Sequence, residues 1–511
     1  MKILSPQEFL DKRDNFRQQG KKVIHCHGVF DLLHPGHIVH LEEAKRLGDI
    51  LVITVTAASY VNKGPGRPYF TDELRMKSLA ALECVDYVIL SENETAMEII
   101  NYVQPDYYVK GKEYENFEAD LSQNIEKEIA AVRSYGGEAY FTDNPVVFSS
   151  TKLLNHNFEV FPRGVKEYTQ DLASRYNFAE IKNIVEDLSR LKVLVVGDAV
   201  IDEYVFSSVL GLMSKDRGLS GRYLKEESYL GGVLVVARHL AAFIENVSVC
   251  TLIGQEASIH SQMLNELSGD MFLDLCIDPF FQTTRKRRFI EKRGIREEYD
   301  KLFSINYLME EEQNDKVNRD AFHRKLNTII PAYDMVIVTD YGHGALDQKA
   351  MDIIQERSKF IALNCQTNST NYGMNLITKY SRADVFSLDQ REISLAYSTR
   401  STDYAFLLAK LKKHLNSQGG WLTLGSLGAM AIDADGNTAQ APALTLSVQD
   451  TVGAGDAFFA LSSICAKLEL PFEIGTFFGN IAGALAANVL GNSKASNKLE
   501  FLKFAATLLN V

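Results

Sequence analysis

Short apolar runs alternate with longer segments of mixed polarity through the first 160 residues. The pattern predicts a strand at 23–28, a helix at 35–47 and a strand at 50–55, which together form a β-α-β unit. Three further apolar runs predict additional strands, at 87–90, 107–109 and 138–141. Strands that alternate with helices in this way are typical of a parallel, doubly wound sheet.

A second alternating series begins at Lys192 and ends in a helix of small residues at 479–490. Its apolar runs lie at 192–198, 335–340, 360–364 and 421–425. Between 205 and 307 the pattern shifts to short β segments, which predicts a small β lid on an α/β core. We therefore predict an α/β protein with two doubly wound parallel-sheet domains, at 1–160 and 191–511, joined by a helical linker at 161–190.

Length and composition agree with this division. The chain has 511 residues, which is more than one hydrophobic core usually organises. Its net charge of −12 argues against a general nucleic-acid binder, because such proteins neutralise phosphates with a basic face. The six cysteines are scattered without a CxxC spacing, and no apolar stretch reaches the roughly 20 residues of a membrane helix. We expect a cytoplasmic protein without a nucleic-acid or membrane partner.

The first candidate for chemistry is the segment from Gly28 to His37, directly after a predicted strand. His34 and His37 are three positions apart at a predicted helix start, so both imidazoles face the same way. A helix amino terminus favours the negative charge of a triphosphate, and Gly36 leaves room for a close phosphate. Two imidazole donors stabilise charge that develops on an attacked α-phosphate. The alternative is a metal pair or ordinary surface histidines.

The string Gly28-x-Phe30-Asp31-x-Leu33-His34-x-Gly36-His37 resembles the signature of the cytidylyltransferase-like HxGH nucleotidyltransferases, which have a Rossmann-like fold. Segments at 63–68, 73–75, 109–114 and 149–152 match further motifs of that superfamily in order. The resemblance covers about residues 20–155. It is strongest for the adenylyltransferase half of the bifunctional heptose-phosphate kinase/adenylyltransferases.

This resemblance implies roles for individual residues. His34 and His37 contact the phosphates as catalytic residues, and Lys110 lies near the acceptor phosphate. The remaining nucleotide-binding residues are Gly28, Phe30, Asp31, Gly36, Lys63, Arg67, Ser150 and Thr151. Among these, Lys63 and Arg67 neutralise triphosphate charge, and Ser150 and Thr151 donate to the β- and γ-phosphates. The alternatives are a solvated loop for the two cations and a plain helix cap at 149–151.

The second candidate is a glycine-rich turn at 450–456 that opens an apolar helix. Gly453, Ala454 and Gly455 let backbone N–H groups converge on an anion, and Asp456 stands ready as a base toward a substrate hydroxyl. The chain contains neither a GxxxxGK[ST] P-loop nor the motif set of protein kinases. The alternative is a turn that connects strand and helix for structural reasons alone.

The turn resembles the DTxGAGD signature of the ribokinase/PfkB sugar kinases, and the resemblance spans about residues 190–511. It implies that Asp456 is the base and that Gly453, Ala454 and Gly455 form the anion hole. The implied ATP loop is Thr423, Gly425 and Gly428. The implied sugar contacts are Asp198, Asp202, Gly231 and Gly232. The implied magnesium site is Asp389 and Glu392.

Two positions depart from the family pattern. Val235 stands where the family has Asn in its GGxxN turn, which removes a polar sugar contact. Asp389 replaces the family's Asn, a mild change because it keeps an oxygen ligand.

Two further segments have two interpretations each. A basic run at 285–296, with Arg287 near its start, indicates capture of a phosphorylated sugar, or else a solvated hairpin or domain contact. The polar segment at 364–368 follows a predicted strand, and it is either a substrate or ATP contact or a structural loop.

Together the two halves predict sugar-nucleotide synthesis. A kinase phosphorylates a sugar or sugar phosphate with ATP, and a transferase joins an NTP, with ATP favoured, to a sugar 1-phosphate. The expected products are an NDP-sugar similar to ADP-heptose and pyrophosphate, with Mg²⁺ as cofactor. The fused heptose enzymes place their kinase first, whereas here the order is reversed.

Two alternatives stay open. One is a CTP-dependent polyol-phosphate cytidylyltransferase with a polyol kinase. The other is an active transferase with a non-catalytic regulatory or dimerisation domain. We expect a homo-oligomer, with a dimer as the commonest state.

Overall fold

The computed structural model describes residues 2–61, 67–93, 95–112, 124–142, 161–267, 269, 271–293, 298–445 and 448–509. The chain divides into two compact units. Unit 1 comprises Met1–Arg175 with Leu502–Val511, and unit 2 comprises Tyr176–Phe501. The boundary after Arg175 falls within the segment predicted as a linker, which holds α7 (Arg163–Arg175) and α8 (Phe178–Asp187). In the described ranges no helix is long and apolar enough to cross a membrane.

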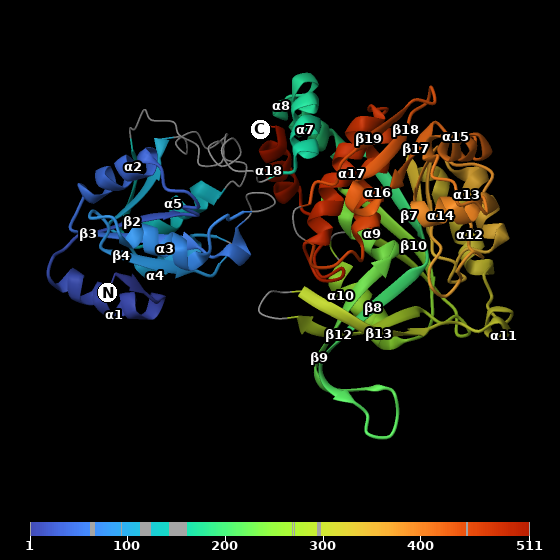
Figure 1. The fold of residues 1–511 in the computed structure, drawn as a ribbon, viewed down its shortest axis with the longest axis horizontal. Coiled ribbons are helices and arrows are strands. Elements are labelled where there is room, and N and C mark those ends of the chain that lie inside the picture. Colours follow the sequence, from blue (N-terminus) through green and yellow to red (C-terminus); the bar gives the residue numbers. More distant parts are fainter. Residues whose placement is uncertain are drawn as a thin grey trace. The chain divides into compact units, whose positions relative to one another are not determined.

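Unit 1 contains a parallel six-stranded sheet in the order β1-β4-β3-β2-β5-β6 (Figure 1). Its strands are β1 (Ile3–Leu4), β2 (Val23–Gly28), β3 (Ile50–Thr56), β4 (Tyr87–Ser91), β5 (Tyr107–Gly111) and β6 (Glu138–Thr142). The predicted β-α-β unit at its start is confirmed. The chain builds β3 and β4 on one side of β2 and then crosses to β5 on the other side. Ligands of such sheets bind at the carboxyl ends where the order reverses, which here means the ends of β2 and β5.

Helices cover both faces of this sheet because its strands carry apolar side chains on both faces. On one face, Leu41, Ala44 and Leu79 pack against residues of β2 and β3. On the other face, Phe9, Ile99, Ile100 and Val132 pack against the same strands. The helices are α1 (Pro6–Gln18), α2 (Pro35–Lys45), α3 (Asp72–Ala80), α4 (Met97–Val103) and α5 (Asn124–Arg133).

Unit 2 is built on a nine-stranded sheet in the order β11-β10-β7-β14-β15-β16-β17-β18-β19. The strands are β7 (Lys192–Gly197), β10 (Asn246–Ile253), β11 (Phe272–Ile277), β14 (Met335–Asp340), β15 (Ile361–Cys365), β16 (Val385–Asp389), β17 (Gly419–Thr423), β18 (Ala429–Ile432) and β19 (Thr438–Ala441). The α/β prediction is confirmed for the strands from β11 to β17, which are parallel. The last two strands are antiparallel, because the turns before them are too short for a parallel crossover.

Helices also cover both faces of the unit 2 sheet. The helices of unit 2 after β7 are α9 (Val233–Ala241), α10 (Ala257–Leu267), α11 (Glu311–Asn314), α12 (Asp320–Ile329), α13 (Gln348–Arg357), α14 (Gln390–Ala396), α15 (Tyr404–His414), α16 (Ala454–Lys467) and α17 (Phe472–Ala487). The unit boundary after Phe501 falls within the last helix, α18 (Lys498–Leu509). The helices α16 and α17 pack closely at Gly479, where a Cβ atom would lie 2.7 Å from the ring of Phe458. The small residues of the predicted carboxyl-terminal helix therefore serve helix packing.

A separate four-stranded sheet forms the predicted lid of unit 2, in the order β13-β12-β8-β9. Its strands are β8 (Ala199–Leu212), β9 (Leu219–Gly232), β12 (Thr284–Arg293) and β13 (Glu298–Tyr307). Figure 1 shows the hairpin of β8 and β9 extending beyond the rest of the unit. The lid begins earlier than predicted, and β10 and β11, which lie between its halves in sequence, belong to the main sheet. The basic run lies on β12, while Arg296 is outside the described residues.

Candidate active sites

The HxGH segment of unit 1 brings two imidazoles together at the start of α2. His34 caps the helix in an extended conformation, and Pro35 occupies its first turn. The rings of His34 and His37 stack with centroids 3.9 Å apart and an angle of 24° between their planes. The ring of Phe30 packs against His37, with centroids 5.4 Å apart, and it also lies 3.2 Å from where a Cβ of residue 28 would stand. Gly28 therefore makes room for the aromatic ring that supports the histidine pair.

Asp31 binds the loop that joins β3 to α3. Its Oδ1 accepts the backbone N–H groups of Tyr69 and Phe70 at 2.7 and 3.0 Å. Its Oδ2 pairs with the Arg67 guanidinium at 3.0 Å, and the two side chains are only 5% and 3% exposed. Arg67, expected at the triphosphate, is thus paired with Asp31, which lies between β2 and α2. Lys63, Ser150 and Thr151 lie outside the described residues.

Lys110 lies at the carboxyl end of β5, where the sheet order reverses. Its Nζ pairs with Glu128 Oε2 of α5 at 3.0 Å, with side-chain exposures of 13% and 8%. The Tyr108 hydroxyl donates to the same oxygen at 2.9 Å. Sequence analysis missed Glu128 and Tyr108. Tyr108 carries a signal, since it shares a face of the strand with Lys110, but nothing in the sequence marks Glu128.

Two more histidines line this end of the sheet in their neutral form. His25 and His27 of β2 both bond Thr54 Oγ1, each at 2.7 Å. Burial, with a smaller contribution from the Lys110 cation, lowers the pKa of His25 to about 3, and the same causes lower the pKa of His27. The cation at this position is therefore Lys110, paired with Glu128, rather than an imidazolium ion.

Replacing Glu128 by Gln is expected to destabilise unit 1 by about 1–3 kcal/mol, because Lys110 loses the charged partner of a nearly buried pair. Hydrogen exchange of peptides that cover β5 should become faster. Glu126→Gln is the matched control, because Glu126 is exposed on the same helix. Equal exchange in the two variants would mean that the Lys110 pair contributes nothing to the stability of the unit.

The glycine-rich turn of unit 2 begins α16. Gly453 caps the helix with φ 83°, and a Cβ there would lie 2.1 Å from Asn492 Oδ1. A Cβ on Gly455 would meet no atom within 4 Å. Only glycine fits both the backbone conformation and the space at position 453. The turn therefore presents the amino end of a 14-residue helix, which favours an anion.

Asp456 lies in the first turn of this helix. Its Oδ1 accepts two hydrogen bonds, from the Tyr341 hydroxyl at 2.8 Å and from Gln366 Nε2 at 3.0 Å. Burial raises the pKa of Asp456 to about 6, and the two hydrogen bonds oppose that rise. A carboxylate with this pKa is ionised near neutrality and basic enough to accept a proton from a hydroxyl.

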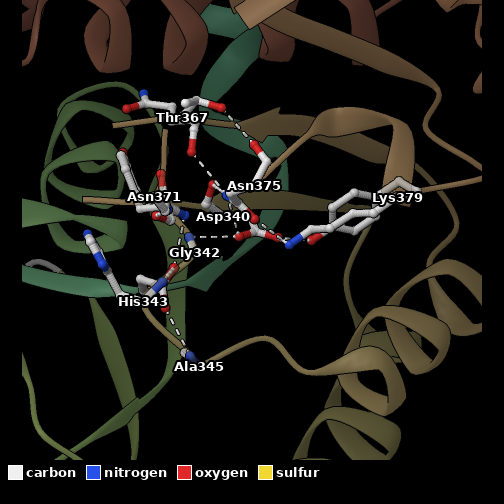
Figure 2. Close-up of polar contacts among 12 residues, drawn as sticks. Asp340, Gly342, His343, Ala345, Thr367, Asn371, Asn375 and Lys379 are labelled. Carbon is white, nitrogen blue, oxygen red and sulfur yellow. Dashed lines mark hydrogen bonds and ion pairs between the residues drawn. The ribbon is translucent and has the colours of Figure 1, made fainter. Parts of the chain in front are cut away.

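Two buried aspartates hold the loop that carries Tyr341. The Asp198 carboxylate accepts the backbone N–H groups of Tyr341, His343 and Ala345, at 2.9, 3.2 and 2.9 Å. Figure 2 shows Gly342, His343 and Ala345 beside Asp340, with Lys379 reaching Asp340 from the other side. The Asp198 oxygens therefore fix this loop, and the contact with sugar hydroxyls expected for Asp198 stays a prediction.

Asp202 lies where β8 meets β12 and is joined to two other residues. Its Oδ1 pairs with Arg288 Nη1 at 2.5 Å, and its Oδ2 accepts a hydrogen bond from Asn492 Nδ2 at 3.2 Å. A Cβ on Gly231 would lie 2.5 Å from that Oδ2, so the glycine makes room for the carboxylate. Gly232 has φ 62° and caps α9, and Val235 is buried on that helix.

The strand β12 separates its cations onto two faces. Lys286 is the register partner of Asp202, and Arg288 pairs with the same carboxylate. Arg287 faces the other way and binds Glu203 at 2.6 Å. The cations beside Asp202 are therefore Lys286 and Arg288, and the sugar contact expected for Arg287 stays a prediction. The two-residue period of a strand is the signal that could have shown this.

The expected ATP loop follows β17. Thr423 ends the strand, and Gly425 and Gly428 have φ 60° and 96°. A Cβ on Gly428 would lie 2.0 Å from the Ala441 carbonyl oxygen, so only glycine allows the backbone to pass there. The loop is open at Gly425, where a Cβ would meet nothing within 4 Å.

Asp389 and Glu392 form a capping box at the start of α14. Glu392 N–H donates to Asp389 Oδ1 at 2.7 Å, and Asp389 N–H donates to Glu392 Oε2 at 2.8 Å. Thr367 N–H donates to Glu392 Oε1 at 3.1 Å, and burial raises the pKa of Glu392 to about 8. Within the described part of the chain no three His, Cys, Asp or Glu side chains are grouped to hold a metal. Carboxylate oxygens are the ligands that Mg²⁺ prefers, and the exposed Asp389 offers them, whereas both oxygens of Glu392 already accept backbone N–H groups.

Two family models match the chain. Residues 25–156 match the family described as Cytidylyltransferase-like, and residues 284–498 match the family described as pfkB family carbohydrate kinase. The second match covers the β12–β13 half of the lid and the helix that begins with the glycine-rich turn. The first covers the HxGH segment and Lys110.

Curated relatives match a part of the chain. The bifunctional protein HldE of Syntrophotalea carbinolica is 35% identical over 150 residues, which are 29% of this chain and 29% of the relative. The bifunctional protein HldE of Alcanivorax borkumensis is 36% identical over 154 residues, which are 30% of this chain and 31% of the relative. The matched part is thus less than a third of the length of either relative.

Solved structures similar to the chain include sugar kinases. Escherichia coli phosphofructokinase-2 is 15% identical, with a TM-score of 0.49, over 62% of this chain and 99% of that chain. Thermotoga maritima ribokinase is 16% identical, with a TM-score of 0.47, over 61% of this chain and 99% of that chain. The two family models match successive parts of the chain, the Cytidylyltransferase-like model first and the pfkB family carbohydrate kinase model second.

Proposed function

We propose that the chain is a bifunctional enzyme of sugar-nucleotide synthesis. The observation that carries the proposal is the presence of one phosphate-handling helix start in each unit. In unit 1 two stacked imidazoles begin α2, and in unit 2 a glycine turn and a carboxylate begin α16. The two matched family descriptions, one for each activity, support it. The sugar product is an NDP-sugar of the ADP-heptose kind.

The kinase step uses Asp456 as its base. The substrate hydroxyl gives its proton to Asp456 Oδ2, its oxygen forms a bond to the γ-phosphorus of ATP, and the bond to the β,γ-bridging oxygen breaks to release ADP. Backbone N–H groups at Gly453–Gly455 neutralise charge on the transferred group. Asp389 and Glu392 would hold Mg²⁺, which would supply shielding of the phosphate charge. Lys286 and Arg288 face the acceptor side, next to Asp202.

The transferase step needs no covalent intermediate. A phosphate oxygen of the sugar 1-phosphate attacks the α-phosphorus of an NTP, and the bond to the α,β-bridging oxygen breaks to release pyrophosphate. His34 and His37 donate to the oxygens on which charge develops. Lys110, held by Glu128, stabilises the acceptor phosphate. Positioning and electrostatics supply the acceleration.

Two alternatives predict different products. A CTP-dependent cytidylyltransferase for a polyol phosphate would consume CTP instead of ATP. A non-catalytic kinase domain would produce no ADP from any sugar, but the hydrogen bonds that fix Asp456 argue against this alternative. Incubating the protein with a panel of sugars and sugar phosphates, with ATP or CTP, and identifying the products by mass spectrometry separates all three. We expect ADP and an ADP-sugar, and the absence of both would refute the proposal.

Lys286 and Arg287 provide a matched test of the acceptor side. Lys286→Met is expected to lower kcat/KM for the kinase substrate about 10- to 100-fold, because it removes a charge-assisted contact beside Asp202. Arg287→Met, on the outer face of the same strand, is expected to change it less than about threefold, as is usual for surface ion pairs. Steady-state kinetics with the sugar found in the panel measure both. A larger loss of kcat/KM in the Arg287 variant than in the Lys286 variant would support the predicted contact of Arg287 with the sugar.

A further inference from the structure

Both hydrogen bonds to Asp456 arrive at one oxygen. The Tyr341 hydroxyl and Gln366 Nε2 donate to Oδ1, at 2.8 and 3.0 Å. Among the described residues no hydrogen bond reaches Oδ2. The carboxylate is therefore held at one end and has its other oxygen left for the substrate.

Tyr341 is itself fixed at three points. Its backbone N–H donates to Asp198 Oδ2 at 2.9 Å. Its carbonyl oxygen accepts from Asn368 Nδ2 and Asn371 Nδ2, each at 2.8 Å. The side chain is 5% exposed, so the hydroxyl has little freedom to leave Asp456. A residue that is fixed in this way can hold the group that it contacts in one orientation.

Gln366 approaches from a different strand. It follows β15, and its backbone N–H donates to the Asp340 carbonyl at 2.8 Å, while its carbonyl accepts from Asn375 Nδ2 at 3.0 Å. The two donors thus come from the ends of two neighbouring strands, β14 and β15, and converge on a helix that lies later in the chain. The segments that carry the two donors are also bonded to each other, because Asn368 donates to the Tyr341 carbonyl oxygen. A single hydrogen-bonded network therefore fixes both donors against Asp456.

Charged groups face Asp456 from the surrounding elements. Burial and the Asp202 carboxylate of β8 raise its pKa, whereas Tyr341, Gln366 and the Lys286 ammonium of β12 lower it. The Glu392 carboxyl of α14 also interacts with Asp456. A hydrogen bond to an ionised carboxylate stabilises the charged form and so lowers the pKa. Loss of either donor should therefore raise the pKa of Asp456.

We propose that Tyr341 and Gln366 are positioning residues for the kinase base, which orient Asp456 Oδ2 toward the substrate hydroxyl. The inference rests on the proposed kinase function. It adds two residues that touch neither the sugar nor ATP and act through Asp456. Their effect is therefore expected on kcat and on the pH profile more than on KM.

The test compares Tyr341→Phe, Gln366→Leu and the double variant with the wild type. Each single variant should lower kcat about tenfold at pH 8, since a misplaced base transfers protons less often. The acid limb of the kcat/KM profile should move up by about 0.5–1 pH unit, because each donor stabilises the ionised form. The double variant should move it further, and KM should change little.

Tyr380→Phe is the matched control. Its hydroxyl donates to Asp340 Oδ2 at 2.7 Å within the same buried cluster, without reaching Asp456. Its removal should leave the acid limb in place. Trp421, the single tryptophan and fully buried in unit 2, reports through its emission whether each variant is folded.

A second readout separates this inference from the kinase function. Carboxyl ¹³C NMR, with the Asp456 signal assigned from its absence in Asp456→Asn, follows the titration without any turnover. A higher pKa in the Tyr341 and Gln366 variants supports the positioning role even if no sugar is phosphorylated, an outcome that would refute only the proposed function. An unchanged Asp456 titration in the double variant would overturn the inference.

Discussion

An Asp456→Asn variant is expected to lose kinase turnover by a factor of about 10²–10⁴, the usual contribution of a positioned general base. The amide keeps the size of the side chain and can still accept from Tyr341 and Gln366, so the site keeps its shape. What it loses is an oxygen that can accept a proton. The measurement is ADP release with the sugar identified in the product panel, under saturating ATP.

The same substitution should spare the transferase. Supplied with a sugar 1-phosphate and NTP, the variant should form the NDP-sugar at a rate close to that of the wild type, because Asp456 belongs to unit 2 and the HxGH pair to unit 1. Loss of both activities in a folded variant would contradict the assignment of the two reactions to separate sites.

Wild-type kinase activity should also depend on pH in a defined direction. Asp456 acts as a base only when ionised, and burial raises its pKa to about 6. The kcat/KM profile should therefore be flat above about pH 7 and fall as the pH drops through 6. Asp198 has the same raised pKa of about 6, from burial and from Asp340, so the Asp456 carboxyl signal is needed to assign the limb. A profile without an acid limb near pH 6 would contradict Asp456 as the base.

The alternation of apolar and polar positions predicted most of the architecture. The runs at 23–28, 50–55 and 192–198 became β2, β3 and β7 with small shifts at their ends. Those strands are central in their sheets, and burial on both faces leaves a continuous apolar signal. The edge strands β1 and β19 were not predicted, because two and four residues are too few to show an apolar pattern.

Chemical motifs named candidate residues for each site but not the contacts that hold these residues in place. The family resemblance implies a sugar contact for Asp198, and no motif predicted that its carboxylate also holds a loop that begins 143 positions later. Tyr341 and Gln366 reach Asp456 across 115 and 90 positions. Such pairings depend on sheet order, which local patterns do not encode. The pairing of Arg287 with Glu203 instead of Asp202 could have been predicted, since strand periodicity is local.

Replacing His37 by Ala is expected to lower nucleotidyl transfer by a factor of about 10²–10³, the cost of removing one donor to a developing phosphate charge. The imidazole stacks on His34 at 3.9 Å and is supported by Phe30, so the loss also loosens the partner ring. Alanine favours the helix, which keeps α2 intact. Pyrophosphate release from NTP and a sugar 1-phosphate measures the effect.

His40→Ala provides the control on the same helix. His40 bonds Thr142 Oγ1 at 2.9 Å and takes no part in the stacked pair, so its removal should cost transfer less than about tenfold. The kinase reaction should be unchanged in both variants, because neither residue lies in unit 2. A double His34→Ala, His37→Ala variant should be little worse than the worse single variant, since residues that act as a unit do not add. Full transferase activity in the His37 variant would contradict a catalytic role and would assign the imidazole pair to the stability of the loop. Lys110 would then be the next candidate for the phosphate donor.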